Sequence, residues 1–303
     1  MGDGYQDFIA RHPGSDLKLG DRLNYHYLDE GEGEAVVMVH GNPTWSYYFR
    51  GLAEALSLDH RVIAPDHIGC GRSDKPGDDR YAYTLESRVR DLETLLDHLK
   101  IDAGITLVVH DWGGMIGMAF AARHPERIAR LVVLNTSAFH LPASKPFPWP
   151  LWVCRDWPLG AWLVRGLNAF CRGTAWIGCK HHAMPAEVRA GYLAPYDSWA
   201  NRIAIHRFVQ DIPLRPGDRA YELVSRTEDR LEKFVDTPML IGWGMKDFVF
   251  DRHFLAEWER RFPAAEVHRF PEAGHYVLED ESDRLIPLVR AFLAAHPVLR
   301  TVG

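Results

Sequence analysis

The stretch VVHDWGGMIG (residues 108–117) passes from an apolar run, through Asp111, into a turn built on Gly113 and Gly114. A strand that turns sharply into a helix, with small residues at the corner, is typical of a nucleophile elbow. The start of the helix then faces the reacting atoms. Val109 departs from the serine form of this motif, which has glycine there, and an Asp at a helix start can also be a simple cap. The stretch alone leaves both interpretations open.

Similar apolar runs recur along the chain. Runs that are apolar at nearly every position favour strands buried on both faces, as in a parallel sheet. Before them, residues 17–33 read as an antiparallel hairpin leading into the sheet. The predicted buried strands are AVVMVHG (35–41), RVIAPD (61–66), ITLVVHD (105–111), ARLVVLN (129–135) and PMLIGWG (238–244).

Helical spacing fills the intervals between these strands. We expect helices in SRVRDLETLLDHLK (87–100), MIGMAFAARHP (115–125) and RAYELVSRTEDRLEKF (219–234). Strands that alternate with helices in this way predict an α/β fold, with a mostly parallel sheet flanked by helices.

The rhythm changes between residues 137 and 215, where no buried strand is expected. We interpret this segment as a helical cap inserted after the sixth strand, between core segments 1–136 and 216–303. Its most apolar tract, 149–170, contains charges and prolines, so it does not qualify as a membrane-spanning helix. It could still form an interfacial or substrate-facing surface. Six of the ten tryptophans lie in the cap: Trp149, Trp152, Trp157, Trp162, Trp176 and Trp199.

The composition excludes several classes of protein. With 47% hydrophobic and 25% charged residues, the chain has the composition of an ordinary globular protein. Its net charge of −6 gives no reason to expect that it binds nucleic acid. Neither the cysteines nor the few cap histidines match a zinc pattern, so we expect no metal and no cofactor. The opening segment lacks the apolar core of a signal peptide. Four scattered cysteines then favour a cytoplasmic location: Cys70, Cys154, Cys171 and Cys179.

Three further segments supply partners for Asp111. HGNPTW (40–45) follows a predicted strand and could turn backbone N–H groups toward the elbow. Asp247 follows the strand at 238–244, and His275 lies in a Gly-His loop after the last strand. The chain order is therefore nucleophile, acid, base, which is the order of the α/β-hydrolases.

Together these motifs resemble the haloalkane dehalogenase and epoxide hydrolase branch of the α/β-hydrolase superfamily, from about residue 20 to residue 296. The resemblance implies that Asp111 is the nucleophile, His275 the base and Asp247 the acid that orients it. It also implies an oxyanion hole formed by the N–H groups of Asn42 and Trp112. An ionised carboxylate attacks carbon directly and needs no base to activate it.

Within this branch the motifs leave alternatives. A haloalkane dehalogenase would use Asn42 and the indole of Trp112 to hold the halide. An epoxide hydrolase would need two cap tyrosines, and Tyr192 and Tyr196 lie too close together to match that pattern comfortably. Some α/β-hydrolase folds are binding proteins, but those commonly lose a member of the triad, and all three are present here.

A third group matches more closely. The strings at 191–214, 40–50 and 242–251 are similar to the β-lactone decarboxylases of bacterial long-chain olefin biosynthesis, the OleB proteins. The resemblance implies conversion of a cis-3,4-dialkyl β-lactone into a cis-alkene and carbon dioxide, by attack of Asp111 at either the ring carbon or the carbonyl. It implies a substrate with long alkyl chains under an aromatic cap. It also implies possible assembly with a β-lactone synthetase and a reductase.

Overall fold

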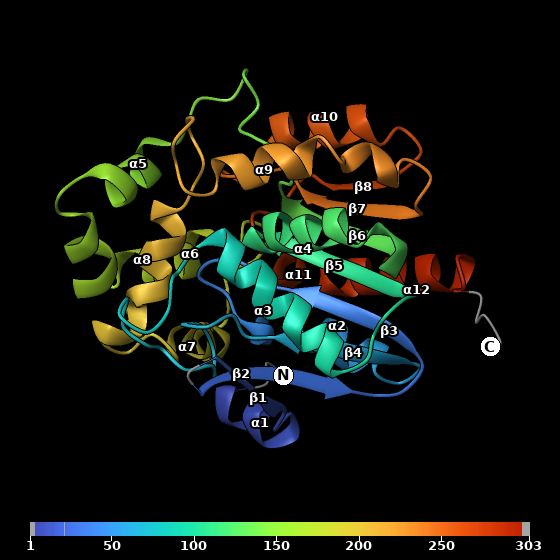
Figure 1. Cartoon of the computed structure of the whole chain (residues 1–303), viewed down its shortest axis with the longest axis horizontal. Helices are drawn as coiled ribbons and strands as arrows, with labels where there is room; N and C mark the ends of the chain where they lie inside the picture. The colour runs from blue at the N-terminus through green and yellow to red at the C-terminus, as the bar shows by residue number, and fades with distance from the viewer. Residues whose placement is uncertain (1–3, 21, 299–303) are drawn as a thin grey trace.

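A computed structural model describes residues 4–20 and 22–298, so part of the opening segment in which no signal peptide is expected lies outside it (Figure 1). One eight-stranded sheet has the order β1-β2-β4-β3-β5-β6-β7-β8. The strands are β1 (Ser15–Leu19), β2 (Leu23–Glu30), β3 (Glu34–Val39), β4 (His60–Pro65), β5 (Ile105–Asp111), β6 (Ile128–Thr136), β7 (Met239–Gly244) and β8 (Glu266–Phe270).

The sheet is parallel from β4 to β8, while β1 and β2 are antiparallel. This confirms the predicted hairpin and the mostly parallel sheet. Strand β5 lies between β3 and β6 and is buried at all seven positions, as an apolar run enclosed on both faces requires. Because β3, β5, β6 and β7 are parallel, their carboxyl ends meet at one edge of the sheet.

Helices cover both faces of the sheet (Figure 1). Helices α3, α4 and α9 pack in sequence over one face, and α2 packs with α12 over the other. The core helices are α1 (Tyr5–Arg11), α2 (Arg50–Leu56), α3 (Leu85–His98), α4 (Trp112–Arg123), α9 (Tyr221–Glu228), α10 (Arg252–Arg261), α11 (Val277–Asp280) and α12 (Ser282–Ala295).

The helix predicted over 219–234 is shorter than expected. Helix α9 ends at Glu228, and the chain continues as a 3-10 turn from Leu231 to Phe234. Residues three apart eclipse one another in a 3-10 turn. Leu231 and Phe234 can therefore face the core together, and each is only 1% exposed.

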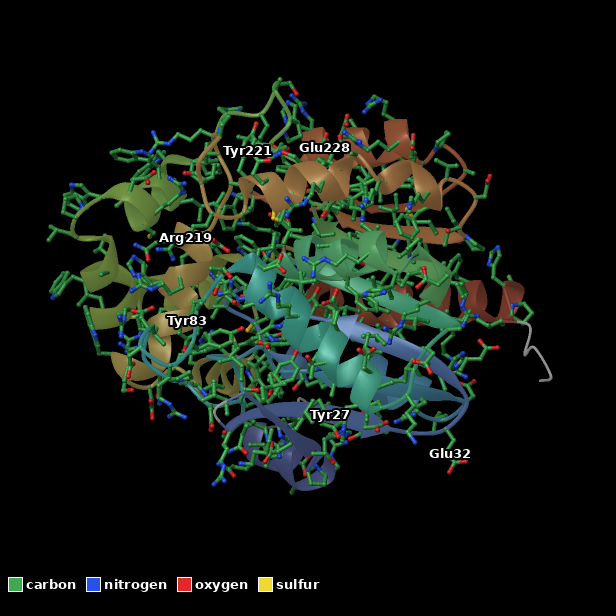
Figure 2. The ribbon with its side chains drawn as sticks, viewed as in Figure 1. Tyr27, Glu32, Tyr83, Arg219, Tyr221 and Glu228 are labelled. Carbon is green, nitrogen blue, oxygen red and sulfur yellow. The ribbon has the colours of Figure 1, made fainter. Side chains whose placement is uncertain are left out.

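The segment that follows the sixth strand is helical, as predicted. It contains α5 (Trp149–Asp156), a π-helical turn (Trp162–Gly166), α6 (Ala169–Ile177), α7 (Ala186–Leu193) and α8 (Ile203–Gln210). The cap lies at one end of the molecule, opposite the β2–β3 turn that carries Glu32 (Figures 1 and 2). Its limits at residues 137 and 215 stay a prediction.

The cap tryptophans do not lie where an aromatic substrate lining would put them. All six are exposed, from 44% for Trp157 to 75% for Trp149. None of them lines the main cavity under the cap. The aromatic side chains that the cap contributes to the cavity are phenylalanines, among them Phe147 and Phe170, and not these tryptophans.

Candidate active site

The elbow between β5 and α4 gives Asp111 a φ of +52°, a backbone conformation that residues other than glycine rarely adopt. A Cβ atom on Gly113 would lie 1.9 Å from the carbonyl oxygen of Val39, and one on Gly114 would lie 1.9 Å from the Thr136 hydroxyl. Both positions therefore require glycine, because the ends of neighbouring strands β3 and β6 lie too close for a side chain. The Asp111 side chain makes no capping hydrogen bond to α4, so it is not a simple helix cap.

The departure from the motif at Val109 has a compensating feature in α4. A Cβ atom on Gly117 would lie 2.7 Å from a methyl carbon of Val109. The missing side chain of Gly117 in α4 therefore leaves space for the Val109 side chain, so that the strand does not need a glycine there. The elbow geometry survives with valine at this position because residue 117 has no side chain.

The loop after β3 holds one oxygen of Asp111. The backbone N–H of Asn42 donates to Asp111 Oδ1 over 2.6 Å. A Cβ atom on Gly41 would lie 2.1 Å from the same oxygen, so only glycine permits this approach. Burial raises the pKa of Asp111 above its ordinary value, while His275 and the N–H groups of Asn42 and Trp112 oppose that rise. The two predicted N–H donors thus act on the Asp111 carboxylate itself.

His275 joins the two carboxylates. Its Nδ1 lies 2.8 Å from Asp247 Oδ2, and its Nε2 lies 3.6 Å from Asp111 Oδ2. Burial alone would lower the pKa of His275, but the neighbouring Asp247 and Asp111 outweigh burial and raise it. The imidazole is therefore disposed to carry a positive charge between the two acids. The structure brings together all three residues predicted from the sequence.

Asn135 is a site residue that the sequence reading missed. It follows the last apolar residues of β6, and its Nδ2 donates to Asp247 Oδ2 over 3.0 Å. The backbone N–H of Val249 donates to the other Asp247 oxygen over 2.7 Å. Asn135 Oδ1 in turn accepts from the N–H of Gly244 over 2.8 Å. These contacts fix the carboxylate that orients His275.

Two buried histidines hold the loops around the site. His40 Nε2 accepts the backbone N–H of His67, so its Nδ1 carries the proton and donates to the carbonyl of Gly41. Burial lowers the pKa of His40 to about 4, which keeps the ring neutral. His110 Nε2 donates to the carbonyl of His275 over 2.9 Å and so anchors the loop that carries the imidazole.

Helix α8 of the cap contacts the Asn42 and Trp112 side chains. Asn42 Nδ2 donates to the carbonyl of Ile205 over 3.2 Å. The indole of Trp112 packs against the Phe208 ring, with ring centres 5.4 Å apart. Both Asn42 and Trp112 line the cavity beside Asp111. The cap therefore sets the position of polar groups that a substrate would meet.

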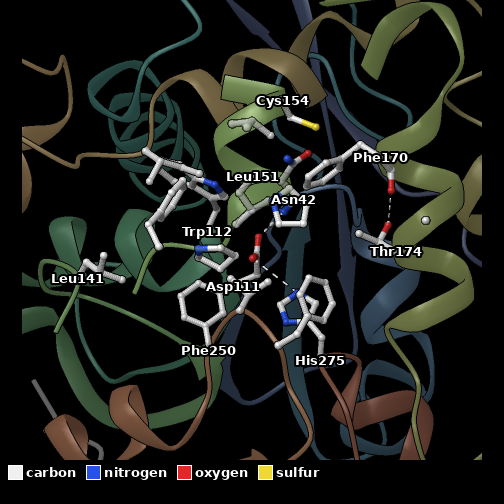
Figure 3. A pocket seen from close by; sticks show the side chains of 18 of the residues that line it. Asn42, Asp111, Trp112, Leu141, Leu151, Cys154, Phe170, Thr174, Phe250 and His275 are labelled. Carbon is white, nitrogen blue, oxygen red and sulfur yellow. Dashed lines mark hydrogen bonds and ion pairs between the residues drawn. The ribbon is translucent and has the colours of Figure 1, made fainter. Parts of the chain in front are cut away.

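A cavity of about 320 Å³ lies between cap and core and ends on Asp111 and His275 (Figure 3). Its walls are mainly apolar. On one side of Asp111 in the view of Figure 3 lies Leu141, and on the other side lie Phe170 and Thr174. The remaining apolar lining comes chiefly from Met115, Phe139, Phe147, Pro148, Leu151, Leu163, Ile212, Leu214 and Phe250.

The two cap tyrosines have other partners. Tyr192 donates its hydroxyl to Glu279 over 2.5 Å, and Tyr196 donates to the carbonyl of Thr44 over 3.2 Å. Neither residue lines the cavity. They are therefore not placed to protonate an opening epoxide. An epoxide hydrolase needs such a pair of acids, so the positions of these two tyrosines argue against that alternative.

The positive side chains of the cap also lie away from the cavity. Arg155 pairs with Asp156 and Asp218, and Arg202 donates to backbone carbonyls. Across residues 4–20 and 22–298, no group of three or more His, Cys, Asp or Glu side chains could hold a metal ion.

Comparisons with known proteins agree with this geometry. Residues 34–282 match the model of the alpha/beta hydrolase fold family. The chain is similar to a mutant haloalkane dehalogenase from Agrobacterium tumefaciens C58, with a TM-score of 0.81 and 25% identity over 93% of this chain and 96% of that one. The chain therefore belongs to the α/β-hydrolase fold family, as its motifs predicted.

Two relatives are more similar in sequence. One, from Shewanella oneidensis MR-1, is 57% identical over 93% of this chain and 88% of its own length. The other, from Xanthomonas campestris pv. campestris, is 53% identical over 93% of this chain and 96% of its own length. Both are named cis-3-alkyl-4-alkyloxetan-2-one decarboxylase, in agreement with the resemblance to β-lactone decarboxylases.

Proposed function

We propose that this enzyme decarboxylates a cis-3-alkyl-4-alkyl β-lactone to a cis-alkene and carbon dioxide, with Asp111 as the covalent nucleophile. The observation that carries the function is the identity of 57% and 53% to two decarboxylases of such lactones, over nearly the whole chain. The chemistry assigned to each residue rests on the geometry of the site.

The cavity suits a substrate with two alkyl chains. Apolar walls lie on both sides of Asp111, with Leu141 on one side and Phe170 on the other (Figure 3). A β-lactone ring bound next to Asp111 could therefore place one of its alkyl chains along each wall. Each buried methylene contributes about 0.8 kcal/mol, so chains of several carbons supply most of the binding energy.

The first step forms an ester on the enzyme. Asp111 Oδ2 attacks ring carbon C4, the C4–O bond of the lactone breaks, and the configuration at C4 inverts. The ring oxygen becomes part of a free carboxylate on C3. The backbone N–H of Asn42 already donates to Oδ1, so it orients Oδ2 as the attacking atom.

The hydrogen bonds favour attack at C4 over attack at the lactone carbonyl. Carbonyl attack would place a new negative charge on the substrate oxygen, which needs N–H donors of its own. The N–H groups of Asn42 and Trp112 act instead on the carboxylate of Asp111. There they also stabilise Asp111 when it departs as an anion.

The second step releases both products. The bond between C3 and the carboxylate carbon breaks, its electrons form the C3–C4 double bond, and the C4–O bond to Asp111 breaks on the opposite face. Inversion followed by anti elimination yields the cis-alkene and restores Asp111. Carbon dioxide and alkene are neutral, so an apolar cavity favours them over the charged carboxylate.

His275 takes part without activating water. Its raised pKa and its position between two carboxylates favour the imidazolium form. That charge can stabilise the carboxylate released from the ring and then the departing Asp111. A dehalogenase would instead need neutral His275 to deprotonate water.

The test is to incubate the protein with a cis-dialkyl β-lactone and, separately, with a 1-bromoalkane. We expect cis-alkene from the lactone and no bromide from the bromoalkane, and no alkene from Asp111→Ala. Rapid bromide release without alkene would overturn the proposal in favour of the dehalogenase. Full turnover by Asp111→Ala would overturn the covalent mechanism.

The site of attack is tested with lactone labelled with ¹⁸O in the ring. Attack at C4 keeps the ring oxygen on the carboxylate, so the label leaves in carbon dioxide. Attack at the carbonyl separates that oxygen from the carboxylate carbon, so carbon dioxide is unlabelled. Membrane-inlet mass spectrometry measures the gas before it exchanges oxygen with water.

Two further proposals concern location and assembly, and only the second rests on the resemblance. We propose a cytoplasmic location, supported by cysteines that are all free among the described residues. Assembly with a β-lactone synthetase and a reductase stays a prediction, which co-purification from the native cell would test.

A further inference from the structure

Exposed apolar side chains gather on the cap. Of eleven large apolar residues that are exposed in the described part of the chain, nine lie between residues 149 and 199. Trp149 is 75% exposed and Trp176 is 67% exposed. Exposed apolar clusters of this kind mark interaction sites. We call the following residues the tryptophan face: Trp149, Trp152, Trp157, Trp162, Trp176 and Trp199.

The tryptophan face comes from the same helices that wall the cavity. Helix α5 carries Trp149 and Trp152 outward, while its Leu151 lines the cavity. Helix α6 carries Trp176 outward, while its Phe170 lines the cavity. A layer one helix thick therefore separates the face from the substrate cavity.

Three cap residues reach both the solvent and the cavity. Pro150, Ala169 and Ile177 are exposed to solvent and also line the cavity. They mark where the cavity approaches the outside, and two of them, Pro150 and Ile177, directly follow Trp149 and Trp176 in the chain. An apolar substrate entering there would pass the tryptophan face.

The cap is also the basic part of the chain. Residues 137–215 contain nine Lys and Arg against four Asp and Glu, although the whole chain has a net charge of −6. The Arg189 guanidinium lies 3.9 Å from the ring centre of Trp176. Exposed Arg172 precedes Trp176 by one helical turn and so projects on the same side.

Ion pairs neutralise part of this charge, because Arg155 pairs with Asp156 and Asp218, Lys145 with Asp251 and Arg207 with Asp78. Asp211 is buried beside Arg88. No ion pair with a carboxylate is seen in the described residues for Arg165, Arg172 and Arg189 of the cap. Glu187 and Asp197 are exposed. A surface that combines exposed tryptophan with an excess of arginine is complementary to anionic headgroups over an apolar layer.

We propose that the tryptophan face docks on an anionic phospholipid surface, with the cavity mouth turned toward the lipid. The transfer of alkyl lactone or alkene through that mouth rests on the proposed function, whereas the docking does not. No helix in residues 4–20 and 22–298 is long and apolar enough to span a membrane, so the contact is interfacial. A second copy of the chain suits this face less, because two basic caps would repel.

The test is co-sedimentation of the full chain with vesicles, without substrate. Phosphatidylglycerol–phosphatidylcholine vesicles are compared with pure phosphatidylcholine. We expect binding to the anionic vesicles, weakened by salt, and a loss of at least roughly tenfold in affinity for W149S/W176S. The matched control is L58S/V235S, which removes two exposed apolar side chains outside the cap and should bind as wild type does.

Each outcome has a defined meaning. Wild-type protein that stays in solution with anionic vesicles overturns the proposal, as does equal binding by W149S/W176S. Gel filtration that shows a dimer lost in W149S/W176S, without vesicle binding, assigns the face to a second copy. Turnover of a short-chain β-lactone without lipid reports the proposed function separately, and W149S/W176S should retain it because neither residue lines the cavity.

Discussion

At the scale of single residues, the charges on Asp111 and His275 predict how activity depends on pH. Both pKa values are raised, Asp111 above 3.8 and His275 above 6.5. Asp111 is the required anion only above its pKa, and His275 is a cation only below its pKa. We therefore expect kcat/KM for alkene formation to fall on the acidic side through the pKa of Asp111 and on the basic side through that of His275.

A pH series of initial rates, with alkene measured by gas chromatography, checks this profile. Activity that instead rises through the pKa of His275 would mean that the neutral ring acts as a base, as hydrolysis requires. That outcome would contradict the role proposed for the imidazolium.

Asn135 supplies a second prediction. Asn135→Asp removes the donor to Asp247 and places two carboxylates in contact, so kcat/KM should fall by about tenfold or more. The control is Asn168→Asp, another buried Asn at positive φ, which donates to the carbonyl of Tyr196 outside the cavity. Both variants should unfold more easily in urea, but only Asn135→Asp should lose activity. Equal activity of the two would contradict a positioning role.

The sequence predicted Asp111 and Asp247 because they stand at or just after the end of recognisable buried strands. It predicted His275 because a Gly-His loop completes the known order of nucleophile, acid and base. Asn135 also ends an apolar run, but its partner lies 112 residues away. No local pattern marks such a contact, so only the folded sheet reveals it.

At the scale of elements, the elbow predicts an unequal response to the same substitution. Gly113→Ala would place a Cβ atom 1.9 Å from the carbonyl oxygen of Val39, and should destabilise the protein by about 2 kcal/mol or more. Gly51→Ala in α2 meets only a side-chain carbon of Ile286 at 3.5 Å, and should stabilise by roughly 0.5–1 kcal/mol. Urea unfolding measures both, and similar effects would show that the elbow is not tightly packed.

The fit between β5 and α4 predicts coupling between Val109 and Gly117. Gly117→Ala alone should destabilise the protein, because its Cβ atom would lie 2.7 Å from Val109. Val109→Ala in the same chain removes that contact, so the double variant should recover about 1 kcal/mol relative to additivity. Purely additive free energies of unfolding would mean that Gly117 does not compensate for Val109.

Strands were easier to predict than helices. Because β3, β5, β6 and β7 are buried on both faces, each has a run of apolar residues that can be recognised without knowledge of the rest of the fold. The edge strand β8 is mostly polar and has no such run. The segment 219–234 has helical spacing throughout, yet Leu231 and Phe234 reach the core through a 3-10 turn. Local spacing does not distinguish these two ways of burying the same side chains.

At the scale of the whole molecule, a buried pair connects cap and core. Asp211 follows α8, accepts the N–H of Leu85 over 2.6 Å and lies 3.8 Å from Arg88. Burial raises the pKa of Asp211 to about 6. Between about pH 4 and 6 the folded state therefore binds more protons than the unfolded state, and this contribution to stability is lost as pH rises.

Asp211→Asn, which does not titrate, should gain stability relative to wild type as pH rises from about 4 to about 6, and the difference should level off above that. Urea unfolding of both proteins across this range measures the slope. A difference that stays constant would contradict the raised pKa.

The cap as a whole was predicted from its composition, but the direction of its tryptophans was not. A residue count places aromatic side chains in a segment without saying which side of each helix they occupy. The helices are short and their orientation depends on the sheet below. The outward tryptophans therefore emerge only from the assembled molecule.

Helix α8 has a consequence for how such enzymes diversify. Its Ile205 carbonyl holds Asn42, its Phe208 packs on Trp112, and Asp211 at its end reaches Leu85 of the core. A chimaera that exchanges this cap for one from a distant relative would replace contacts on which the core's reacting groups depend. We therefore expect new substrate preferences to arise by changes within a cap more readily than by its exchange.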